Sequence, residues 1–496
     1  MTSADPKTAD SKPGAKPRRR WLQFTVRGLI VLTFLVAMGI SWLRKEAIRA
    51  REQRLAVEQA LELHARLDFK DAGPDWLKSV IGEDLFVKVD SVETEHLGTI
   101  DADMTWLAAL DDLQVLTFKY STSTWPRSAM GDATVAHVAD MRELRRLSLP
   151  RFDLTDRGAI ALEVHPEMTY LKLPETLITD DGLAHIRHMH KLWHLDLSGL
   201  PGVTDAGLVH LQDMNNLRWL YLSQTSVTGP GLEHLRGMNS LQSLFLAETP
   251  LMDEGIAHIG QLKSLRELNL SSTRITDAGL AQLGDMPNLG RLELEGTLIT
   301  DSAFKHLAGC PNLEFLSYDS QMITGDGLAD LAALPNIQQL FLSDANLNEN
   351  GWQALAQLKQ VQAVYLDGAQ VTDEELKKLV EAMPQLITLD LAETHVTDAG
   401  VACISQMPSL LLLDLRGTKV TDACLPALAC CASLESVSLT NTAVTSDAVI
   451  QFANSLQGRA MAVSWDEGDI GNPRIGASIM RAAPLKGQDE NNTTIQ

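Results

Sequence analysis

Hydrophobic and polar positions along the chain repeat at a nearly constant interval. After one longer step of 31 residues, the first apolar residue of each copy recurs every 24 or 25 residues, at Leu113, Leu144, Met168, Leu192, Leu217, Leu241, Leu265, Leu289, Leu313, Ile337, Val361, Leu386, Leu410 and Leu434. A fixed period in this range is the signature of a repeat architecture, in which every copy is one small structural unit. The pattern predicts an array of such units over residues 113–456.

The copy that begins at Leu265 indicates what each unit forms. Leu268 and Leu270 alternate with polar residues, which is the pattern of a short strand with one buried face and one open face. Apolar residues then recur at helical spacing after Asp277. An Asp at this place favours the start of a helix, because its carboxylate accepts hydrogen bonds from the first turn. Each unit is therefore a strand followed by a helix.

One such unit cannot bury its leucines alone, so neighbouring units must stack strand beside strand around a continuous core. Paired strands lie about 4.8 Å apart whereas packed helices need about 8 to 10 Å, so the strand side must be concave. The sequence therefore predicts an α/β fold, a right-handed βα superhelix curved like a horseshoe.

The repeats follow the template L-x-x-L-x-L-x-x-T-x-I-T-D-x-G-L-x-x-L-x-x-M. This template resembles the leucine-rich-repeat family, in the class that carries Thr or Cys where commoner repeats carry Asn, a class similar to that of F-box-linked adaptor proteins. The threonines at this position are Thr176, Thr225, Thr249, Thr273, Thr297, Thr394, Thr418 and Thr442. They predict a ladder of hydroxyl groups along the array, interrupted at Gln321, Ala345 and Ala369.

The segment before the repeats has the composition of a membrane anchor. Residues 1–20 are basic and offer little to bury, so we expect them to be disordered. Residues 21–43 are almost uncharged, with Trp21 and Trp42 where interfacial aromatic residues belong. A helix of this length reaches about 34 Å and crosses a core of about 30 Å, which predicts a transmembrane signal anchor with the repeats outside the cytoplasm. A cleaved signal peptide ending near Gly39 is the alternative.

The remaining segments are expected to connect and cap the array. Residues 44–72 are interpreted as a juxtamembrane helical stalk, and residues 73–112 as an N-terminal cap with the first repeat helix. The start of that cap resembles the leader found before the repeats of membrane-anchored bacterial leucine-rich-repeat proteins. At the other end we expect a cap strand at 457–465 and a disordered tail at 466–496.

The charge of the chain narrows the classes of partner. The net charge is −22, and residues 1–54 carry 12 Lys and Arg against 4 Asp and Glu, so the remainder of the chain carries −30. A body this acidic repels nucleic acid. Phosphate-loop, zinc-protease and nucleophile-elbow motifs are absent from the sequence, so we expect no enzyme activity, no cofactor and no metal.

Histidines and cysteines give no strong sign of a site. His185, His188, His190 and His194 lie close in sequence and are interpreted as surface composition. The five cysteines include no C-x-x-C pair, and we expect Cys310 to fill the core.

The open face of the strands is the candidate binding site. Aromatic and acidic residues alternate there, and the predicted protein-binding residues are Trp219, Tyr221, Phe245, Glu267, Glu293, Phe315, Phe341, Tyr365 and Asp390. Large apolar groups with no core to fill indicate an interaction surface, and acids beside them favour a basic protein or peptide ligand.

The sequence thus favours a membrane-anchored, non-catalytic scaffold for protein binding in the bacterial cell envelope. Two alternatives remain open at this stage. The repeat class resembles the substrate adaptors of ubiquitin ligases, although residues 1–84 contain a predicted span instead of an F-box. A purely structural envelope protein also fits the pattern.

Overall fold

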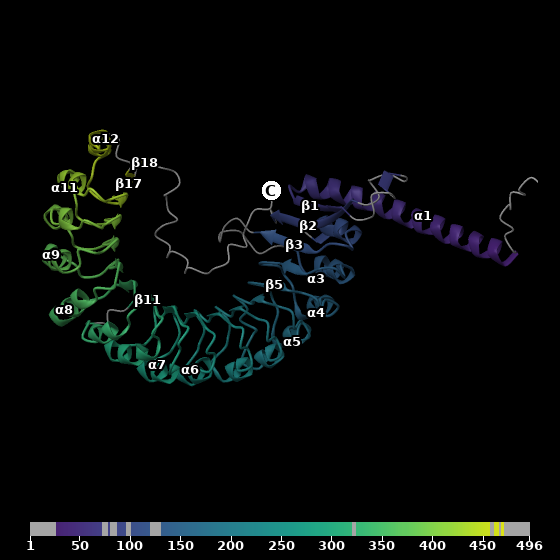
Figure 1. Cartoon of the computed structure of the whole chain (residues 1–496), viewed down its shortest axis with the longest axis horizontal. Helices are drawn as coiled ribbons and strands as arrows, with labels where there is room; N and C mark the ends of the chain where they lie inside the picture. Colours follow the sequence, from purple (N-terminus) through teal and green to yellow (C-terminus); the bar gives the residue numbers. More distant parts are fainter. Residues whose placement is uncertain are drawn as a thin grey trace, which may run out of the picture.

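Short parallel strands line the inner side of a curved array, and helices cover its outer side (Figure 1). The computed structural model describes residues 26–71, 78–79, 87–95, 101–119, 130–319, 324–456, 461–465 and 468–470. The strands of the described residues form one sheet in which β2 to β17 pair in parallel, each with the next in sequence. The predicted α/β solenoid is therefore confirmed.

Most strands are three residues long, because each repeat contributes one short crossing of the sheet. Their bounds are β1 Arg66–Asp71, β2 Val87–Glu95, β3 Val115–Lys119, β4 Arg146–Ser148, β5 Tyr170–Lys172, β6 His194–Asp196, β7 Trp219–Tyr221, β8 Ser243–Phe245, β9 Glu267–Asn269, β10 Arg291–Glu293, β11 Phe315–Asp319, β12 Gln339–Ser343, β13 Ala363–Tyr365, β14 Thr388–Asp390, β15 Leu412–Asp414, β16 Ser436–Ser438, β17 Ala462–Trp465 and β18 Gly468–Ile470.

The outer side mixes α-helices with 3-10 helices, which carry the label η. Their bounds are α1 Val26–Glu62, η2 Asp101–Ala109, α3 Asp132–Ala136, η3 His137–Asp140, α4 Asp156–Ala159, η4 Ile160–Leu162, α5 Asp180–Leu183, η5 Gly207–Leu211, η6 Pro230–Leu235, α6 Asp253–Ile259, α7 Asp277–Leu283, η7 Asp301–Gly309, η8 Leu328–Ala333, α8 Glu349–Gln357, α9 Asp373–Ala382, α10 Asp398–Val401, η9 Ile404–Gln406, η10 Asp422–Cys424, α11 Leu425–Cys430 and α12 Ser446–Ser455.

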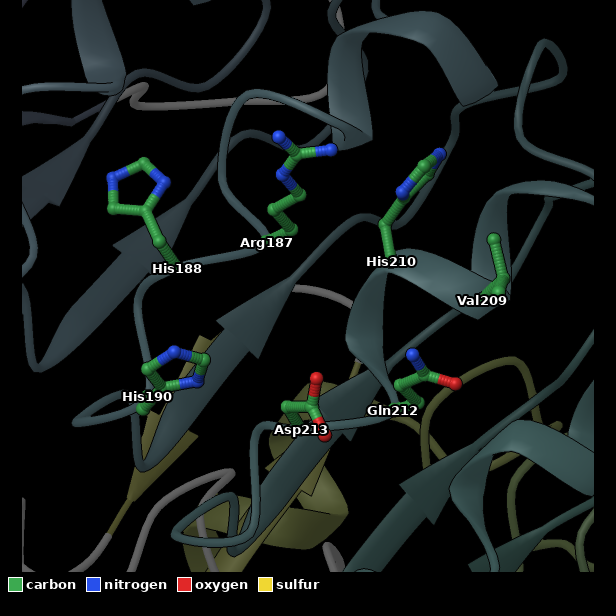
Figure 2. Close-up of a pocket in the computed structure, with 7 residues that line it drawn as sticks. All are labelled: Arg187, His188, His190, Val209, His210, Gln212 and Asp213. Carbon is green, nitrogen blue, oxygen red and sulfur yellow. The ribbon is translucent and has the colours of Figure 1, made fainter.

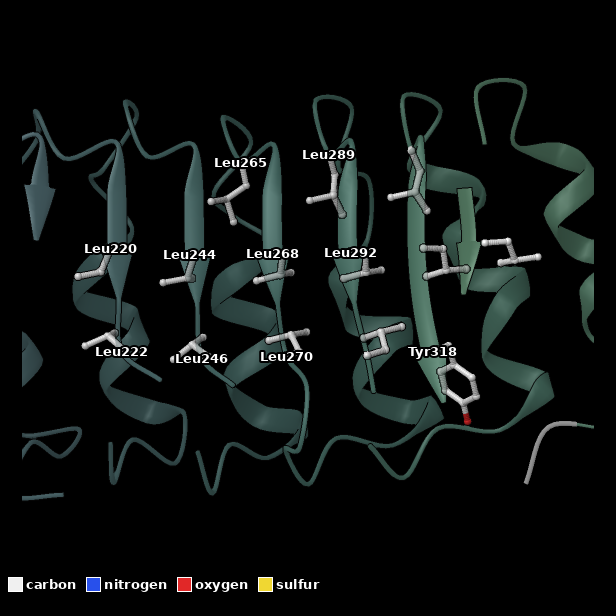
Figure 3. Packing of buried hydrophobic residues seen from close by; sticks show 14 of the residues in the cluster. Leu220, Leu222, Leu244, Leu246, Leu265, Leu268, Leu270, Leu289, Leu292 and Tyr318 are labelled. Carbon is white, nitrogen blue, oxygen red and sulfur yellow. The ribbon is translucent and has the colours of Figure 1, made fainter. Parts of the chain in front are cut away.

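The leucines of the template form the core between the sheet and the helices (Figure 3). Leu268 and Leu292 stand side by side in register on β9 and β10, and both are buried. Each fully buried side chain of this kind contributes roughly 1.5 to 3 kcal/mol before conformational entropy is subtracted. The core is thus a continuous row of leucines.

An Asp–Thr ladder joins neighbouring repeats on the outer side. Asp253 accepts hydrogen bonds from the backbone N (2.8 Å) and the hydroxyl (2.7 Å) of Thr276 in the next repeat. The same two bonds join Asp132 to Thr155, Asp156 to Thr179, Asp180 to Thr204, Asp205 to Thr228, Asp277 to Thr300, Asp301 to Thr324, Asp373 to Thr397, Asp398 to Thr421 and Asp422 to Thr445.

This ladder differs from the role that the sequence suggested for the Asp. We expected each Asp to cap its own helix, but Thr276 does so, because its hydroxyl accepts from the backbone N of Ala278 at 3.2 Å. The Asp is turned to the following repeat. The glycine of T-D-x-G makes room for this bond, since a Cβ at Gly279 would collide with the Asp253 carboxylate.

A joint of the ladder is the place where the Asp of one repeat meets the Thr of the next. At two joints both the Asp and the Thr are replaced by other residues. Gly229 stands where an Asp is expected and Met252 where the next Thr is expected, and Gly325 and Asn348 are paired in the same way. Both glycines have a positive φ, and a Cβ on Gly229 would lie 2.8 Å from the backbone of Gly255. Close backbone packing therefore replaces the carboxylate at these joints.

A third joint carries the longer Glu349 in place of the Asp. Glu349 pairs with Lys378 at 2.8 Å, and Thr372, its expected partner, forms a capping box with Glu375 of its own helix. At this joint the Thr caps α9, and the acidic side chain bonds to a cation further along that helix.

The hydroxyls that we expected to form a ladder along the array bond within their own repeats instead. The Thr273 hydroxyl donates to the carbonyl of Leu270 at 2.6 Å, and Thr297 bonds to Leu294 in the same way. They close the turn after each strand. Gln321, one of the expected interruptions, lies outside the described residues.

The first described helix is longer than the expected segments. α1 is continuous over Val26–Glu62, and its second half packs on the first repeat through the buried Ala56 and Ala60. Arg49 extends this contact with an ion pair to Asp112 (2.8 Å). Small residues four apart allow this close approach. Residues 44–62, expected to form a stalk, therefore lie against the body.

Membrane insertion was expected over residues 21–43, of which 21–25 lie outside the described residues. No helix in the described part of the chain combines the length and the apolar character needed to cross a bilayer, so this prediction is not confirmed.

Antiparallel strands close both ends of the sheet. β1 pairs with β2, within the region where a stalk and a cap were expected. At the other end β17 pairs in parallel with β16, and β18 then pairs antiparallel with β17. A short strand thus stands at 468–470, where the sequence indicated disorder. Residues 1–20 and 471–496 lie outside the described residues.

Candidate functional site

Strand register places the side chains of the concave face in two columns. The first column runs Arg146, Tyr170, His194, Trp219, Ser243, Glu267, Arg291, Phe315, Gln339, Ala363, Thr388 and Leu412. The second column runs Ser148, Lys172, Asp196, Tyr221, Phe245, Asn269, Glu293, Ser317, Phe341, Tyr365, Asp390 and Asp414. All nine predicted binding residues therefore lie on one face, distributed over eight strands.

The amino-terminal aromatic cluster consists of Tyr170, Trp193, His194, Trp219, Tyr221 and Phe245. The rings of Tyr221 and Phe245 stack with centroids 4.5 Å apart, and those of Tyr170 and His194 with centroids 4.3 Å apart. Trp193 and Trp219 meet edge to face at 5.3 Å. Offset and edge-to-face contacts of this kind add stability beyond area burial, and they hold the rings in fixed orientations. The cluster is therefore a preformed surface.

The carboxy-terminal aromatic cluster consists of Arg291, Phe315, Phe341 and Tyr365. Phe341 stacks on Tyr365 with centroids 3.7 Å apart and contacts Phe315 at 4.7 Å. The Arg291 guanidinium lies 3.5 Å from the Phe315 ring centroid, which is a cation–π contact. Phe315 and Tyr365 are buried within this stack, whereas Phe341 is only partly buried. Most of the accessible aromatic surface of this cluster therefore belongs to Phe341.

Two predicted acidic residues between the clusters are held by neighbours on the same face. Glu267 accepts from the Ser243 hydroxyl at 2.8 Å, and Glu293 pairs with Arg291 at 2.6 Å. Asn269 donates to Glu293 as well. Both carboxylates are therefore bound by neighbouring side chains, whereas the sequence suggested that they would face a basic ligand.

Asp390 belongs instead to an acidic group formed with Asp367 and Asp414. Burial, and then the neighbouring carboxylate of Asp414, raise the pKa of Asp390 to about 7. Burial likewise raises the pKa of Asp367. Arg416 pairs with Asp414 at 2.6 Å and compensates part of this negative charge. Such a group can attract a cationic side chain from a ligand.

Three buried polar atoms on the concave side have no hydrogen-bond partner among the described residues. They are Nε2 of His194, Oγ of Ser271 and Oε1 of Gln339. Each of these atoms is enclosed by neighbouring protein atoms, although buried polar atoms are nearly always paired.

Tyr170 and His194 were missed by the sequence reading. His194 was grouped with three histidines of the outer side, but it is buried in the first column of the concave face. Both residues directly precede the first leucine of their strand, as Trp219 does. This shared position in the repeat could have identified them from the sequence.

Two other histidines of that group, His188 and His190, border a pocket on the helical side of the array (Figure 2). It is lined by Arg187, His188, His190, Val209, His210, Gln212 and Asp213. Within the part of the chain that the structure describes, no three His, Cys, Asp or Glu side chains are grouped closely enough to hold a metal ion. Burial lowers the pKa of His188, which favours a neutral imidazole. This pocket carries no evident catalytic arrangement.

Solved structures of three other proteins are similar to this chain. An internalin from Listeria monocytogenes is 19% identical, with 70% of this chain and 86% of that chain covered and a TM-score of 0.45. A leucine-rich-repeat protein from Leptospira interrogans is 14% identical, with 80% and 93% covered and a TM-score of 0.44. A plant peptide hormone receptor, RGFR1, in complex with RGF2 is 16% identical, with 71% and 65% covered and a TM-score of 0.33.

Comparison with curated protein sequences finds no significant match. A family model described as leucine-rich repeat region matches residues 177–445, which is more than half of the 496 residues. The chain belongs to the leucine-rich-repeat family.

Proposed function

We propose that the chain is a non-catalytic scaffold that binds a protein or peptide on its concave face. The observation that carries this proposal is the pair of aromatic clusters on the open side of the sheet. Trp219, Tyr221, Phe245 and Phe341 keep part of their surface exposed there, and aromatic residues are enriched at protein interfaces. Leucine-rich-repeat proteins are generally non-catalytic interaction proteins, which supports the same conclusion.

The acidic group favours a partner with basic residues beside its apolar ones. Asp367 lies in the turn after β13, Asp390 on β14 and Asp414 on β15, next to the carboxy-terminal aromatic cluster. A Lys or Arg that follows an apolar residue of the partner would meet both surfaces in succession. Charge complementarity of this kind fixes the register of a ligand more than it adds affinity.

The test is selection of peptides from a displayed random library on the full chain. We expect enriched peptides with apolar and basic residues. Combined substitution of Trp219, Tyr221, Phe245 and Phe341 by Ala should reduce their binding at least about tenfold, since each lost hot-spot residue costs about 1 kcal/mol or more.

A matched control changes two exposed apolar residues away from the two columns, Leu177→Ala and Leu298→Ala. This variant should bind the selected peptides like the wild type, and both variants should keep the wild-type circular dichroism. Undiminished peptide binding by the quadruple aromatic variant would reject the concave face as the binding surface.

We also propose that the chain is attached to the membrane of the bacterial cell envelope through residues 21–43, with the repeats on the extracytoplasmic side. Leu29, Ile30, Phe34 and Ile40 are each more than half exposed on α1. A contiguous apolar surface of this kind favours contact with a membrane or a partner.

The test is flotation of the full chain with lipid vesicles. The wild type should float, and a variant with Leu29, Ile30, Phe34 and Ile40 replaced by Ser should stay in the dense fraction. Protease accessibility of the repeats in intact cells then tests the side of the membrane. A wild-type chain that stays in the dense fraction contradicts the attachment.

A further inference from the structure

A polar hollow lies at the amino ends of β7, β8 and β9, outside the two columns of the concave face. Its volume is about 260 Å³, and its lining within the described part of the chain consists of arginine, asparagine, serine and glutamine side chains. No carboxylate and no large apolar side chain belongs to this lining. An anion that enters the hollow therefore meets cations and hydrogen-bond donors without meeting an acid.

The repeat brings two arginines of the hollow to the same side of the array. Arg218 directly precedes β7 and Arg266 directly precedes β9, and Gln242 holds the same place before β8. The backbone N of Gln242 donates to the carbonyl of Arg218 at 2.9 Å, and the backbone N of Arg266 donates to the carbonyl of Gln242 at 2.7 Å. The backbones of the two arginines are thus two strand steps apart, about 10 Å.

Both arginines keep their charges available. Their side chains are exposed and form no hydrogen bond or ion pair with other described residues. Arg145, at the corresponding place before β4, provides the contrast, because it pairs with Glu167 at 3.1 Å. The protein thus compensates the charge of Arg145 but not those of Arg218 and Arg266, and a guanidinium stays protonated at any pH at which the protein is folded.

Hydrogen bonds between adjacent repeats hold the turns around the hollow. The Ser264 hydroxyl donates to the carbonyl of Leu241 at 2.7 Å, and Asn288 Nδ2 donates to the carbonyl of Lys263 at 2.8 Å. The side chains of three other lining residues have no hydrogen bond within the described part of the chain, and they are Asn239, Ser240 and Gln242. Their amide and hydroxyl donors therefore remain available to a ligand.

We infer that this hollow binds a phosphate monoester group, which lies between Arg218 and Arg266 and accepts from the amide of Gln242. A guanidinium presents paired N–H donors that match two oxygens of a phosphate, and one phosphate has enough oxygens to engage both arginines. A phosphate monoester carries about −1.5 to −2 at pH 7 and so balances two cations, whereas a carboxylate balances only one.

The charge of the surrounding body makes such binding specific to the hollow. Residues 55–496 carry a net charge of −30, so the body as a whole repels anions. Attraction of a phosphate group therefore has to come from a local arrangement of cations and donors, such as the one that Arg218, Gln242 and Arg266 form.

The test follows the 31P NMR signal of methyl phosphate during titration with the full chain. The wild type should broaden the signal in a saturable way. The double variant Arg218→Gln, Arg266→Gln should weaken the affinity at least about tenfold, because it removes the charge-assisted hydrogen bonds. Gln242→Ala should weaken the affinity less, about threefold, because it removes a neutral donor.

The matched control is the double variant Arg142→Gln, Arg274→Gln, which removes two exposed arginines outside the hollow and changes the net charge by the same amount. It should bind methyl phosphate like the wild type. All variants should keep the wild-type circular dichroism, so that a loss of affinity reports the hollow and not the fold.

The charge of the probe gives a second readout. Methyl phosphate gains its second negative charge with a pKa of about 6, so its affinity should rise between about pH 5 and about pH 8. None of the lining side chains titrates in this range. Acetate, with one charge, should bind at least about tenfold more weakly than methyl phosphate at pH 7. Equal affinities for acetate and methyl phosphate would contradict a site built from two cations.

Vesicles distinguish a lipid headgroup from a soluble phosphate ester as the source of the phosphate. The chain for this experiment carries Ser in place of Leu29, Ile30, Phe34 and Ile40, so that α1 does not itself bind lipid. Flotation with vesicles that contain phosphatidic acid, but not with phosphatidylcholine alone, would assign a lipid headgroup, provided that Arg218→Gln, Arg266→Gln abolishes it. Binding of methyl phosphate without flotation would assign a soluble ester.

Two results would overturn the site. One is the absence of saturable broadening with methyl phosphate at millimolar concentration, and the other is equal affinity of the Arg218→Gln, Arg266→Gln variant and the control variant. Peptide binding by the aromatic clusters is judged separately, because the hollow lies outside the two columns of the concave face.

Discussion

The carboxylates of the Asp–Thr ladder and those of the acidic group are the same chemical group in two opposite environments. Asp205, in the ladder, accepts four hydrogen bonds, from the hydroxyl (2.6 Å) and backbone N (3.0 Å) of Thr228 and from the backbones of Gly229 (3.0 Å) and Gly231 (2.8 Å). Asp390, on the concave face, accepts one from the backbone N of Ala392 (2.9 Å) and lies beside other carboxylates.

Their pKa values differ accordingly. Burial alone would raise the pKa of Asp205, but the bonds from Thr228, Gly231 and Gly229 outweigh it and lower the pKa below its usual value. The pKa of Asp390 is raised, because burial and Asp414 act together. Hydrogen bonds from the protein itself thus stabilise the charged carboxylate of Asp205. The charge of Asp390 is stabilised less, so this residue takes up a proton more readily. The ladder joins neighbouring repeats, whereas the acidic group lies on the face that we propose binds a partner.

The largest expected effect is the loss of a ladder carboxylate. Asp205→Ala leaves four donors between two repeats without their acceptor, so it should lower the free energy of unfolding by about 3 kcal/mol, after partial compensation by water. Denaturant unfolding at pH 7 measures this change. Peptide binding on the concave face, measured under native conditions, should be unaltered.

Asp181→Ala is the matched control, because Asp181 is an exposed Asp next to the ladder residue Asp180. Its substitution should change the unfolding free energy by less than about 0.5 kcal/mol. If the two variants are equally stable, the ladder is not what joins the repeats.

A smaller effect, of opposite sign, is expected for the acidic group. The pKa of Asp390 is raised from 3.8 to about 7, so between these pH values the folded chain holds a proton that the unfolded chain has released. Stability from this residue is therefore present below about pH 4 and is lost as the pH rises to 7. Asp390→Asn should raise the unfolding free energy by about 2 kcal/mol at pH 8 and change it little at pH 4.

Unfolding curves of the wild type and Asp390→Asn at pH 4, 6 and 8 measure this difference. Asp205→Ala gives the contrast, because Asp205 with its lowered pKa stabilises the fold above its ordinary pKa and loses that contribution only in stronger acid. A stability difference for Asp390→Asn that is constant from pH 4 to pH 8 would contradict the raised pKa.

The period of the leucines made the solenoid and its concave side predictable, because core residues such as Leu268 recur with the repeat itself. The same regularity was enough to assign Trp219, Phe245 and Phe341 to the open face. The partners of the ladder were not predictable in this way. Asp253 and Thr276 are 23 residues apart, and the template contains both residue types in most copies without showing that they bond across copies.

Non-periodic features were harder to predict. Stacking of His194 on Tyr170 depends on which residues happen to be neighbours in one column, and the helical spacing of nearby histidines drew attention to the outer side instead. The position of α1 likewise depends on two alanines, Ala56 and Ala60, that a composition argument treats as part of a charged helix. Contacts that occur once in the chain leave no repeated signal.

The smallest expected effect concerns the glycine of the T-D-x-G motif. It tests whether the ladder is the reason that glycine occupies this position. Gly279→Ala would place a Cβ against the Asp253 carboxylate, so the Asp253–Thr276 bonds must lengthen or the helix must shift. We expect a loss of about 1.5 kcal/mol in unfolding free energy, because overpacking outweighs the gain in helix propensity. Gly237→Ala is the control, since the nearest atom to its Cβ is Asn215 Oδ1 at 3.4 Å. That variant should be neutral or slightly more stable, and equal effects of the two changes would mean that backbone freedom, rather than room for a neighbouring carboxylate, determines the glycine.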